Sequence, residues 1–172
     1  MAYNGLSSAH YTAHRYQEAL DGYERALVLA REAGNLVTEG NLLNNIAQCH
    51  FTLGDPAAAL APQRAAVDVF REVGDMGFVG LALANLAELE HATGAYAPAE
   101  THARDAIALA ETNDQALTEA FGREVLARVR RDLGDTATAR AELTLAIDLY
   151  DQVRSPLAES ARAARKSLPT DV

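Results

Sequence analysis

The side chains best suited to binding a metal are five histidines, of which His10 and His50 lie forty residues apart. If the chain repeats with that period, their imidazoles fall on equivalent positions of neighbouring helices and could meet one ion. A zinc site takes about four ligands from Cys, His and carboxylate side chains. The next two equivalent positions hold Glu90 and Arg130, so neither Asp nor Cys completes the set. We therefore expect these histidines to pack between helices and predict no metal site.

Nucleophilic and phosphate-binding chemistry also finds little support. The single cysteine, Cys49, follows Ala47 and Gln48, and we expect it to behave as a small buried hydrophobe. One cysteine excludes an internal disulfide framework. The sequence has no glycine-rich phosphate loop, no HExxH and no GxSxG motif. We accordingly predict no catalytic residue, no cofactor and no enzymatic activity.

The charge balance is acidic, with 15 Lys and Arg against 24 Asp and Glu and a net charge of −9. Such a field repels nucleic-acid phosphates and anionic lipids, so neither is an expected partner of this chain. No apolar run approaches the roughly 20 residues that cross a bilayer, and the first residues lack a secretory signal pattern. The sequence thus favours a cytoplasmic protein.

An internal repeat of forty residues organises the chain. Gly54, Gly94 and Gly134 each mark an expected turn, and His14 occupies the same position in the first repeat. A small residue lies seven positions before each turn, and alanines lie five and twelve positions after it. These small positions are Ser7, Ala47, Ala87 and Ala127, then Ala19, Ala59, Ala99 and Ala139, then Ala26, Ala66, Ala106 and Ala146.

Each repeat is expected to form a hairpin of two helices. Apolar residues at three- and four-residue spacing predict the first helices, and a glycine turn ends them. Asp55 and Pro56 begin a second helix, with Asp as the N-cap and Pro at the first helical position. The predicted first helices span 37–52, 77–92 and 115–132, and the second helices span about 16–33, 56–73, 96–112 and 136–153.

One hairpin cannot bury its apolar face alone, so the hairpins must stack. We predict an all-α fold, an α-α superhelix of four hairpins closed by a polar capping helix with Leu157, Ala161, Ala164 and Leu168 on its apolar stripe. The domain is predicted to be 1–172, with repeats at about 1–35, 36–75, 76–114 and 115–154 and the capping helix at 155–168. The first helix of the first repeat is shortened, so we expect the chain to be a fragment of a longer protein.

This pattern resembles the tetratricopeptide repeat (TPR), and the resemblance covers essentially the whole chain. It departs from the usual repeat in length, which is forty residues here instead of 34. Long repeats of this kind are similar to those of Pins-type adaptors, kinesin light chains and the C-terminal arrays of actinobacterial SARP and NB-ARC-type transcriptional regulators. The Ala- and Arg-rich composition favours the last group. The matching residues are Leu86-Ala87, Gly94, Tyr96, Ala99 and Ala106, and Leu6-Ser7, Tyr16, Ala19, Tyr23 and Ala26.

In TPR arrays the open faces of the first helices line a concave groove that takes an extended peptide or a helix. The resemblance therefore implies a protein- or peptide-binding groove on those faces of this chain. The residues at the groove positions are Asn4, Ser8, Tyr11, Asn41, Asn44, Asn45, Gln48, Phe51, Asn85, Glu88, His91, Glu124, Arg128 and Arg131.

The groove asparagines have two interpretations. Asn45 and Asn85 are repeat-equivalent, and a side-chain amide both donates and accepts hydrogen bonds, which suits clamping a peptide backbone. Alternatively, these asparagines bridge adjacent helices within the stack.

The arginines of the fourth repeat also have two interpretations. Together they could receive an acidic segment of a partner. Alternatively, they form a solvated helix face that is paired through Glu124–Arg128 and Arg128–Asp132 at i,i+4 spacing. The arginines concerned are Arg123, Arg128, Arg130 and Arg131.

The expected function is therefore a non-catalytic, protein- or peptide-binding TPR module. The resemblance implies the regulatory or sensor domain of a bacterial transcriptional regulator, which binds a protein, a peptide or other domains of the same regulator. A small-ligand or peptide-pheromone receptor domain is one alternative, favoured by a closed apolar groove lined by Phe51, Leu81 and Phe121. A homodimer, or a homo-oligomerisation scaffold, is the other.

Overall fold

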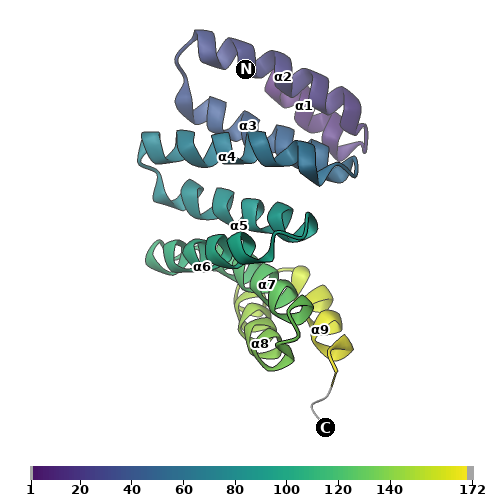
Figure 1. The fold of residues 1–172 in the computed structure, drawn as a ribbon. Helices are drawn as coiled ribbons and strands as arrows, with labels where there is room; N and C mark the ends of the chain where they lie inside the picture. Colours follow the sequence, from purple (N-terminus) through teal and green to yellow (C-terminus); the bar gives the residue numbers. More distant parts are fainter. Residues whose placement is uncertain (1, 170–172) are drawn as a thin grey trace. The chain divides into compact units, whose positions relative to one another are not determined.

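A computed structural model describes the backbone of residues 2–169 and the side chains of residues 7–169. This part of the chain contains nine α-helices and no strand (Figure 1), which confirms the all-α prediction. Most helix boundaries agree with the predicted ones to within about a residue, and α9 begins two residues later than the predicted 155. The helices are α1 (Ala2–Thr12), α2 (Tyr16–Glu32), α3 (Leu36–Thr52), α4 (Pro56–Val73), α5 (Met76–Ala92), α6 (Tyr96–Thr112), α7 (Ala116–Asp132), α8 (Thr136–Gln152) and α9 (Leu157–Ser167).

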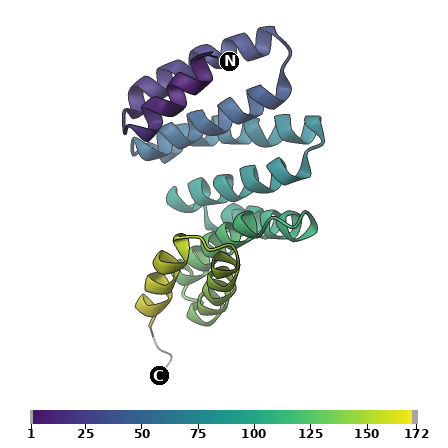
Figure 2. The same ribbon diagram turned by 180° about the vertical axis from the view of Figure 1, so that it is seen from behind.

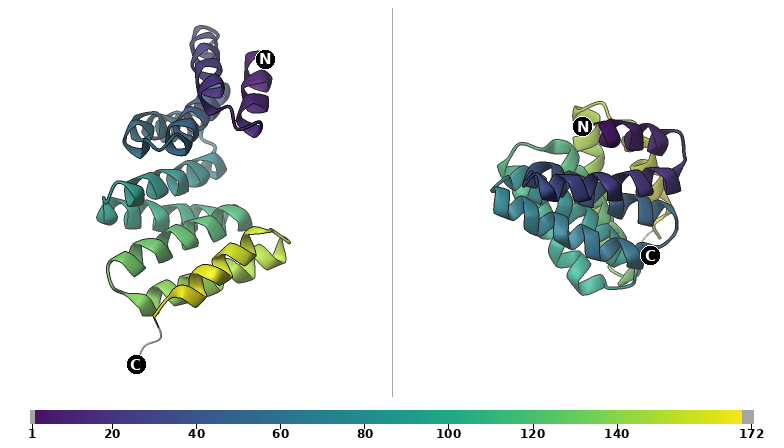
Figure 3. Two further views of the ribbon diagram at one scale, coloured as in Figure 1. Left: turned by 90° about the vertical axis from the view of Figure 1, so that its right-hand side faces the viewer. Right: turned by 90° about the horizontal axis from the view of Figure 1, so that it is seen from above.

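The helices form two compact units, one ending at Phe78 and the other starting at Val79, so the division falls inside α5. In the amino-terminal unit, α2 packs against α1 and α3, and α3 packs against α4 (Figure 2). In the carboxy-terminal unit, α7 packs against α6 and α8, and α9 lies along α8 (Figure 3). Within each unit these helices thus contact their neighbours in the sequence, as in a TPR-like solenoid. The extent of a single domain over 1–172 stays a prediction.

Two positions of the repeat adopt a left-handed backbone. The first joins the two helices of a hairpin, and there His14, with φ 59°, takes the conformation that Gly54 adopts with φ 86°. The second joins one hairpin to the next, and Arg154 occupies it with φ 54°. Glycine adopts positive φ without steric cost, which explains its recurrence at these turns. Among the described residues, positive φ occurs at His14, Gly54, Gly94 and Gly134 and at Gly34, Gly74, Asp114 and Arg154.

Two of the second helices begin with a side-chain cap. Asp55 Oδ1 accepts a hydrogen bond from the backbone N–H of Ala58 at 2.9 Å, and Asp135 Oδ1 accepts one from Thr138 at 3.1 Å. Ala95 occupies the same position at the start of α6 and has no side chain that could accept such a bond. Its first-turn N–H groups therefore lack the partner that the other two helices have.

Replacing Ala95 by aspartate should raise the free energy of unfolding by about 1 kcal/mol, because it supplies the missing N-cap. Far-UV circular dichroism in a urea titration measures the change. The matched variant Asp135→Ala should lower the free energy by a similar amount. Equal stability of all three proteins would show that these caps contribute nothing.

The small residues of the repeat lie where the helices approach one another. Ala59, Ala99 and Ala139 are fully buried, and Ala47 and Ala87 on the first helices are at most 1% exposed. Their burial indicates that they pack between helices. Side chains of this size let the two helices of a hairpin come close and leave room for the next hairpin.

Gly40 marks a further close approach that the forty-residue pattern does not indicate. A Cβ atom at this position of α3 would lie 2.7 Å from Cε1 of Phe70 on α4. The Phe70 ring, which is 2% exposed, occupies the space left by the missing side chain. The hairpin of α3 and α4 therefore closes through an aromatic ring against a glycine, in addition to the alanine contacts.

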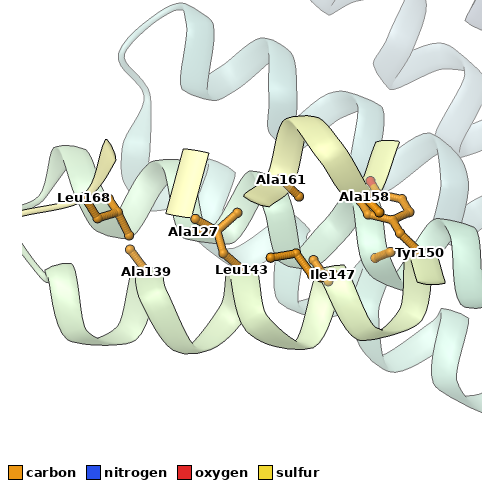
Figure 4. Packing of buried hydrophobic residues seen from close by; sticks show 10 residues of the cluster. Ala127, Ala139, Leu143, Ile147, Tyr150, Ala158, Ala161 and Leu168 are labelled. Atoms are coloured by element: carbon orange, nitrogen blue, oxygen red, sulfur yellow. The ribbon is translucent and has the colours of Figure 1, made fainter. Parts of the chain in front are cut away.

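The capping helix α9 covers the apolar face of α8 (Figure 4). Tyr150, Leu143 and Ile147 of α8 pack in one cluster with Ala158 and Ala161 of α9. Leu168 closes the other end of the cluster, against Ala139. The last hairpin therefore has its apolar surface buried, as expected of a capping helix.

The prediction that Leu157 lies on the apolar stripe of the capping helix is wrong, because this side chain is 48% exposed. Ala158, which is 4% exposed, takes the buried position at the start of α9. At the other end, the guanidinium of Arg140 donates hydrogen bonds to the carbonyl oxygens of Leu168, at 3.2 Å, and Pro169, at 2.9 Å. An arginine of α8 therefore satisfies carbonyls that the helix end leaves without partners.

Cys49 is completely buried in α3, and burial raises the pKa of its thiol to about 11 from a usual 9.0. It packs with Leu42 and Ile46 in the core of the amino-terminal unit. This agrees with the prediction of a buried hydrophobe.

The thiol of Cys49 should therefore react very slowly with Ellman's reagent in the folded protein. At mildly alkaline pH, a pKa of about 11 reduces the thiolate fraction about 100-fold relative to a thiol with a pKa of 9.0, and burial blocks access as well. Urea should restore the rate of an ordinary thiol. The same rate with and without urea would mean that Cys49 is exposed in solution.

Candidate functional site

Four side chains from three helices surround a small pocket in the amino-terminal unit. Tyr11 of α1, Tyr23 of α2, and Asn45 and Gln48 of α3 line a partly open cavity of about 60 Å³. Asn45 and Gln48 are three residues apart on a helix and therefore lie on the same face. Three of the four lining residues are among the predicted groove residues.

The two tyrosines are held in place by hydrogen bonds. Tyr23 is 3% exposed, its hydroxyl lies 3.1 Å from Oγ of Ser8, and burial raises its pKa. The hydroxyl of Tyr11 lies 3.1 Å from Oγ1 of Thr52 on α3. The ring of Tyr11 also makes an edge contact with the ring of Tyr16, with centroids 5.1 Å apart. The phenol groups thus form a fixed wall of the pocket.

The amides of Asn45 and Gln48 differ from those of their neighbours. Both side chains are half-buried, and neither amide forms a hydrogen bond with any residue that the structure describes. By contrast, Oδ1 of Asn44 accepts a hydrogen bond at 3.1 Å from Nε2 of Gln63 on α4. Two asparagines of α3 therefore have different surroundings. Asn44 links the two helices of a hairpin, and Asn45 lines the pocket.

The remaining predicted groove residues of the amino-terminal unit contribute less to the pocket. Asn41 and Phe51 are half-buried on α3 and do not line the pocket. Ser8 contributes through its contact with Tyr23. The side chain of Asn4 lies outside the described side chains. Tyr23, which is part of the pocket, was not predicted as a site residue, although its position in the TPR pattern was recognised.

In the carboxy-terminal unit, predicted groove residues form polar contacts between helices. Oε1 of Glu88 on α5 accepts two hydrogen bonds from the guanidinium of Arg128 on α7, each at 3.1 Å. Nε2 of His91 donates to Oδ2 of Asp132 at 2.8 Å. Asn85 is half-buried on the same helix as Glu88. These contacts join the first helices of the third and fourth repeats.

One interpretation expected Arg128 to pair along α7, the first helix of the fourth repeat, with Glu124 and Asp132. These residues have other partners in the structure. Arg128 pairs with Glu88, and the hydroxyl of Tyr150 donates to Oε2 of Glu124 at 3.1 Å. Burial and the neighbouring Glu124 carboxylate raise the pKa of Tyr150. Asp132 accepts from Nε of Arg131 at 2.7 Å, and this hydrogen bond lowers the pKa of the carboxyl. Glu124 and Arg128 therefore bond to other helices, whereas Asp132 bonds to its neighbour Arg131 on α7.

The other two arginines of α7 point towards second helices. Arg123 forms ion pairs with Glu111 of α6, at 2.7 Å, and with Glu142 of α8, at 3.1 Å. Arg130 pairs with Glu100 of α6. Each of these arginines thus already has carboxylate partners within the unit. They do not form the free basic cluster that one interpretation proposed.

One contact between first helices recurs in both units. The pair Tyr11 and Thr52 joins the first two repeats, and the pair His91 and Asp132 joins the last two. His91 lies eighty residues after Tyr11, and Asp132 lies eighty residues after Thr52, so the two pairs occupy equivalent positions. Comparing alternate repeats in the sequence could have revealed this polar contact.

Within the described residues, no three His, Cys, Asp or Glu side chains gather as metal ligands would. His102 lies on α6 and pairs with the buried carboxylate of Glu90 at 2.7 Å. Among the helices described, none combines the length and apolar character required to traverse a bilayer.

This architecture defines a helical-repeat protein of antiparallel hairpins with a polar surface on its first helices. The tetratricopeptide repeat family model matches residues 1–72 and again residues 39–112, and the chain belongs to this family. It is thus a TPR-type protein-binding module, and no family of enzymes is indicated. No curated protein matches the sequence.

Solved structures share the fold at low sequence identity. The Rap protein in complex with competence and sporulation factor is 15% identical, with a TM-score of 0.84 over 95% of this chain and 46% of that protein. BtubC (BKLC) from P. vanneervenii is 20% identical, with a TM-score of 0.73 over 99% of this chain and 65% of that protein. A signal transduction ATPase with numerous domains (STAND) and a tetratricopeptide repeat sensor, from Pyrococcus horikoshii, is 16% identical, with a TM-score of 0.80 over 95% of this chain and 26% of that protein. The chain therefore spans less than two thirds of each of these proteins.

Proposed function

We propose that the chain binds a peptide segment of a partner through the pocket formed by Tyr11, Tyr23, Asn45 and Gln48. The observation that carries the proposal is the pair of half-buried amides, Asn45 and Gln48, that have no hydrogen-bond partner among the described residues. Buried polar groups in folded proteins usually have a partner, and half-buried amides without one in the chain remain available to a ligand. A peptide segment can supply both the donors and the acceptors that these amides need.

The size and lining of the pocket favour a peptide over a small organic ligand. Sites for such ligands usually enclose about 300–1,000 Å³ and are largely apolar. The pocket encloses about 60 Å³ and has four polar lining side chains. It therefore suits one side chain or one peptide group of a longer ligand. Asn45 is therefore not surrounded by the closed apolar groove that would favour a small-ligand receptor.

The wider context that we propose is a sensor or regulatory domain of a larger regulator. Two proteins of similar fold support this context: the Rap protein binds competence and sporulation factor, and the STAND protein carries a tetratricopeptide repeat sensor. In such a setting the ligand is a peptide, a partner protein or another domain of the same regulator. Homodimer formation is the competing proposal, and light scattering at several concentrations distinguishes it.

Peptides selected from a random display library on the immobilised chain provide the test. Replacing Asn45 and Gln48 together by alanine should weaken the binding of the selected peptides about five- to 150-fold, because each lost hydrogen bond contributes about 0.5–1.5 kcal/mol. Isothermal titration calorimetry gives the affinities.

Gln152→Ala is the matched control, because it removes an exposed amide from the end of α8, far along the chain from the pocket. This variant should bind the peptides as the parent does, and both variants should keep their helical circular dichroism. Selected peptides that bind the double variant as tightly as the parent would exclude the pocket as the binding site.

A further inference from the structure

From the chemistry of the lining side chains we infer that the pocket recognises an uncharged carboxamide group, such as the side chain of glutamine or asparagine, and discriminates against the corresponding carboxylate. This inference rests on the proposed function, since it specifies which part of a peptide enters the pocket. None of the four lining side chains carries a charge at neutral pH.

The hydrogen-bonding capacity of the pocket matches an amide. Asn45 and Gln48 each offer a carbonyl oxygen that accepts and an NH₂ group that donates. The hydroxyls of Tyr11 and Tyr23 each have one partner, Thr52 and Ser8, and an oxygen of this type can make a second hydrogen bond. A carboxamide presents one acceptor and one NH₂ donor group, so both kinds of lining atom can be satisfied together. A carboxylate only accepts, so it leaves the two carbonyl oxygens of the lining amides without a donor.

Electrostatics act in the same direction. A carboxylate that enters the pocket loses part of its hydration and meets no cation on the lining side chains, which is unfavourable. The net charge of −9 adds a repulsive field. The arginines of α7 that could attract an acidic peptide, Arg123, Arg128 and Arg130, already pair with carboxylates of their own unit. These three arginines are therefore not free to attract an acidic ligand.

A matched pair of peptides tests the inference. Each peptide selected on the immobilised chain is synthesised with every Gln or Asn replaced in turn by Glu or Asp, which keeps the shape and changes the group. At one position this replacement should weaken binding to the parent chain about tenfold or more, and a rise in salt concentration should not restore it. On the Asn45→Ala, Gln48→Ala variant, the same replacement should change the affinity by less than about twofold.

The outcomes separate this inference from the proposed function. If no peptide binds, or if the double variant binds as the parent does, the proposed function is wrong and the inference falls with it. If the peptides depend on Asn45 and Gln48 but are acidic, bind more weakly as salt rises, or tolerate the carboxylate, the pocket binds peptides and the inference is wrong. Discrimination that persists in the double variant would place the recognition of the carboxamide elsewhere on the chain.

Discussion

Replacing Tyr150 by alanine is expected to lower the free energy of unfolding by about 3–5 kcal/mol, the range for removing a buried aromatic ring. Tyr150 is 0% exposed and packs between α8 and α9 with Ala158 (Figure 4). Removing the ring leaves a cavity, and the neighbouring helices can move only partly into it because the backbone connects them. Urea titration followed by far-UV circular dichroism measures the loss.

Tyr150→Phe separates packing from hydrogen bonding. This variant keeps the ring and loses only the hydrogen bond from the hydroxyl to Glu124, so a loss of about 1 kcal/mol is expected. If alanine and phenylalanine cost the same, the ring contributes no packing energy, and the capping helix does not depend on this cluster.

Enlarging Ala99 to leucine should lower the free energy of unfolding by about 1–3 kcal/mol, because a close-packed contact must accommodate three extra carbons. Ala99 is fully buried and is one of the four alanines that follow the hairpin turns. The larger side chain either adopts an unfavourable rotamer or pushes α6 away from its neighbour. The same urea titration measures this effect.

Ala97→Leu is the matched control on the same helix. Ala97 is exposed, and leucine has nearly the helix propensity of alanine, so this variant should stay within about 0.5 kcal/mol of the parent. Equal stability of the two leucine variants would show that Ala99 is not a contact between helices, and the packing explanation of the repeat would fail.

The sequence predicts most of the fold because the pattern of a helical hairpin recurs in four repeats. The turn glycines and the buried alanines recur with one period, so His14 could be assigned to a hairpin turn although it is not glycine. The structure gives this residue a left-handed backbone. Helix ends followed from Asp55, Pro56 and the glycine turns. The prediction was wrong at the start of the capping helix, where the repeat has ended. There Ala158 is buried, and Leu157, which was predicted to be buried, is exposed.

The candidate site was predicted less completely than the fold, because the position of a residue on a helix face does not specify its partners. The groove positions gave Tyr11, Asn45 and Gln48, which the structure brings together at one pocket. They could not show that Asn44 bonds to Gln63, or that Arg128 reaches Glu88 forty residues away. Such choices depend on the distance between helices, which side-chain volumes at other positions set. Tyr23 was missed because it belongs to a second helix, and groove positions are taken from first helices.

The most direct test of the proposed peptide-binding pocket is an NMR titration of the side-chain NH₂ signals of Asn45 and Gln48, assigned by their loss in the two single alanine variants. Addition of a selected peptide should shift these signals more than those of the exposed amide of Gln152. Saturation should occur at the affinity found by calorimetry. A peptide that binds with the same affinity and leaves both signals unmoved, while signals from other helices shift, would contradict binding at this pocket.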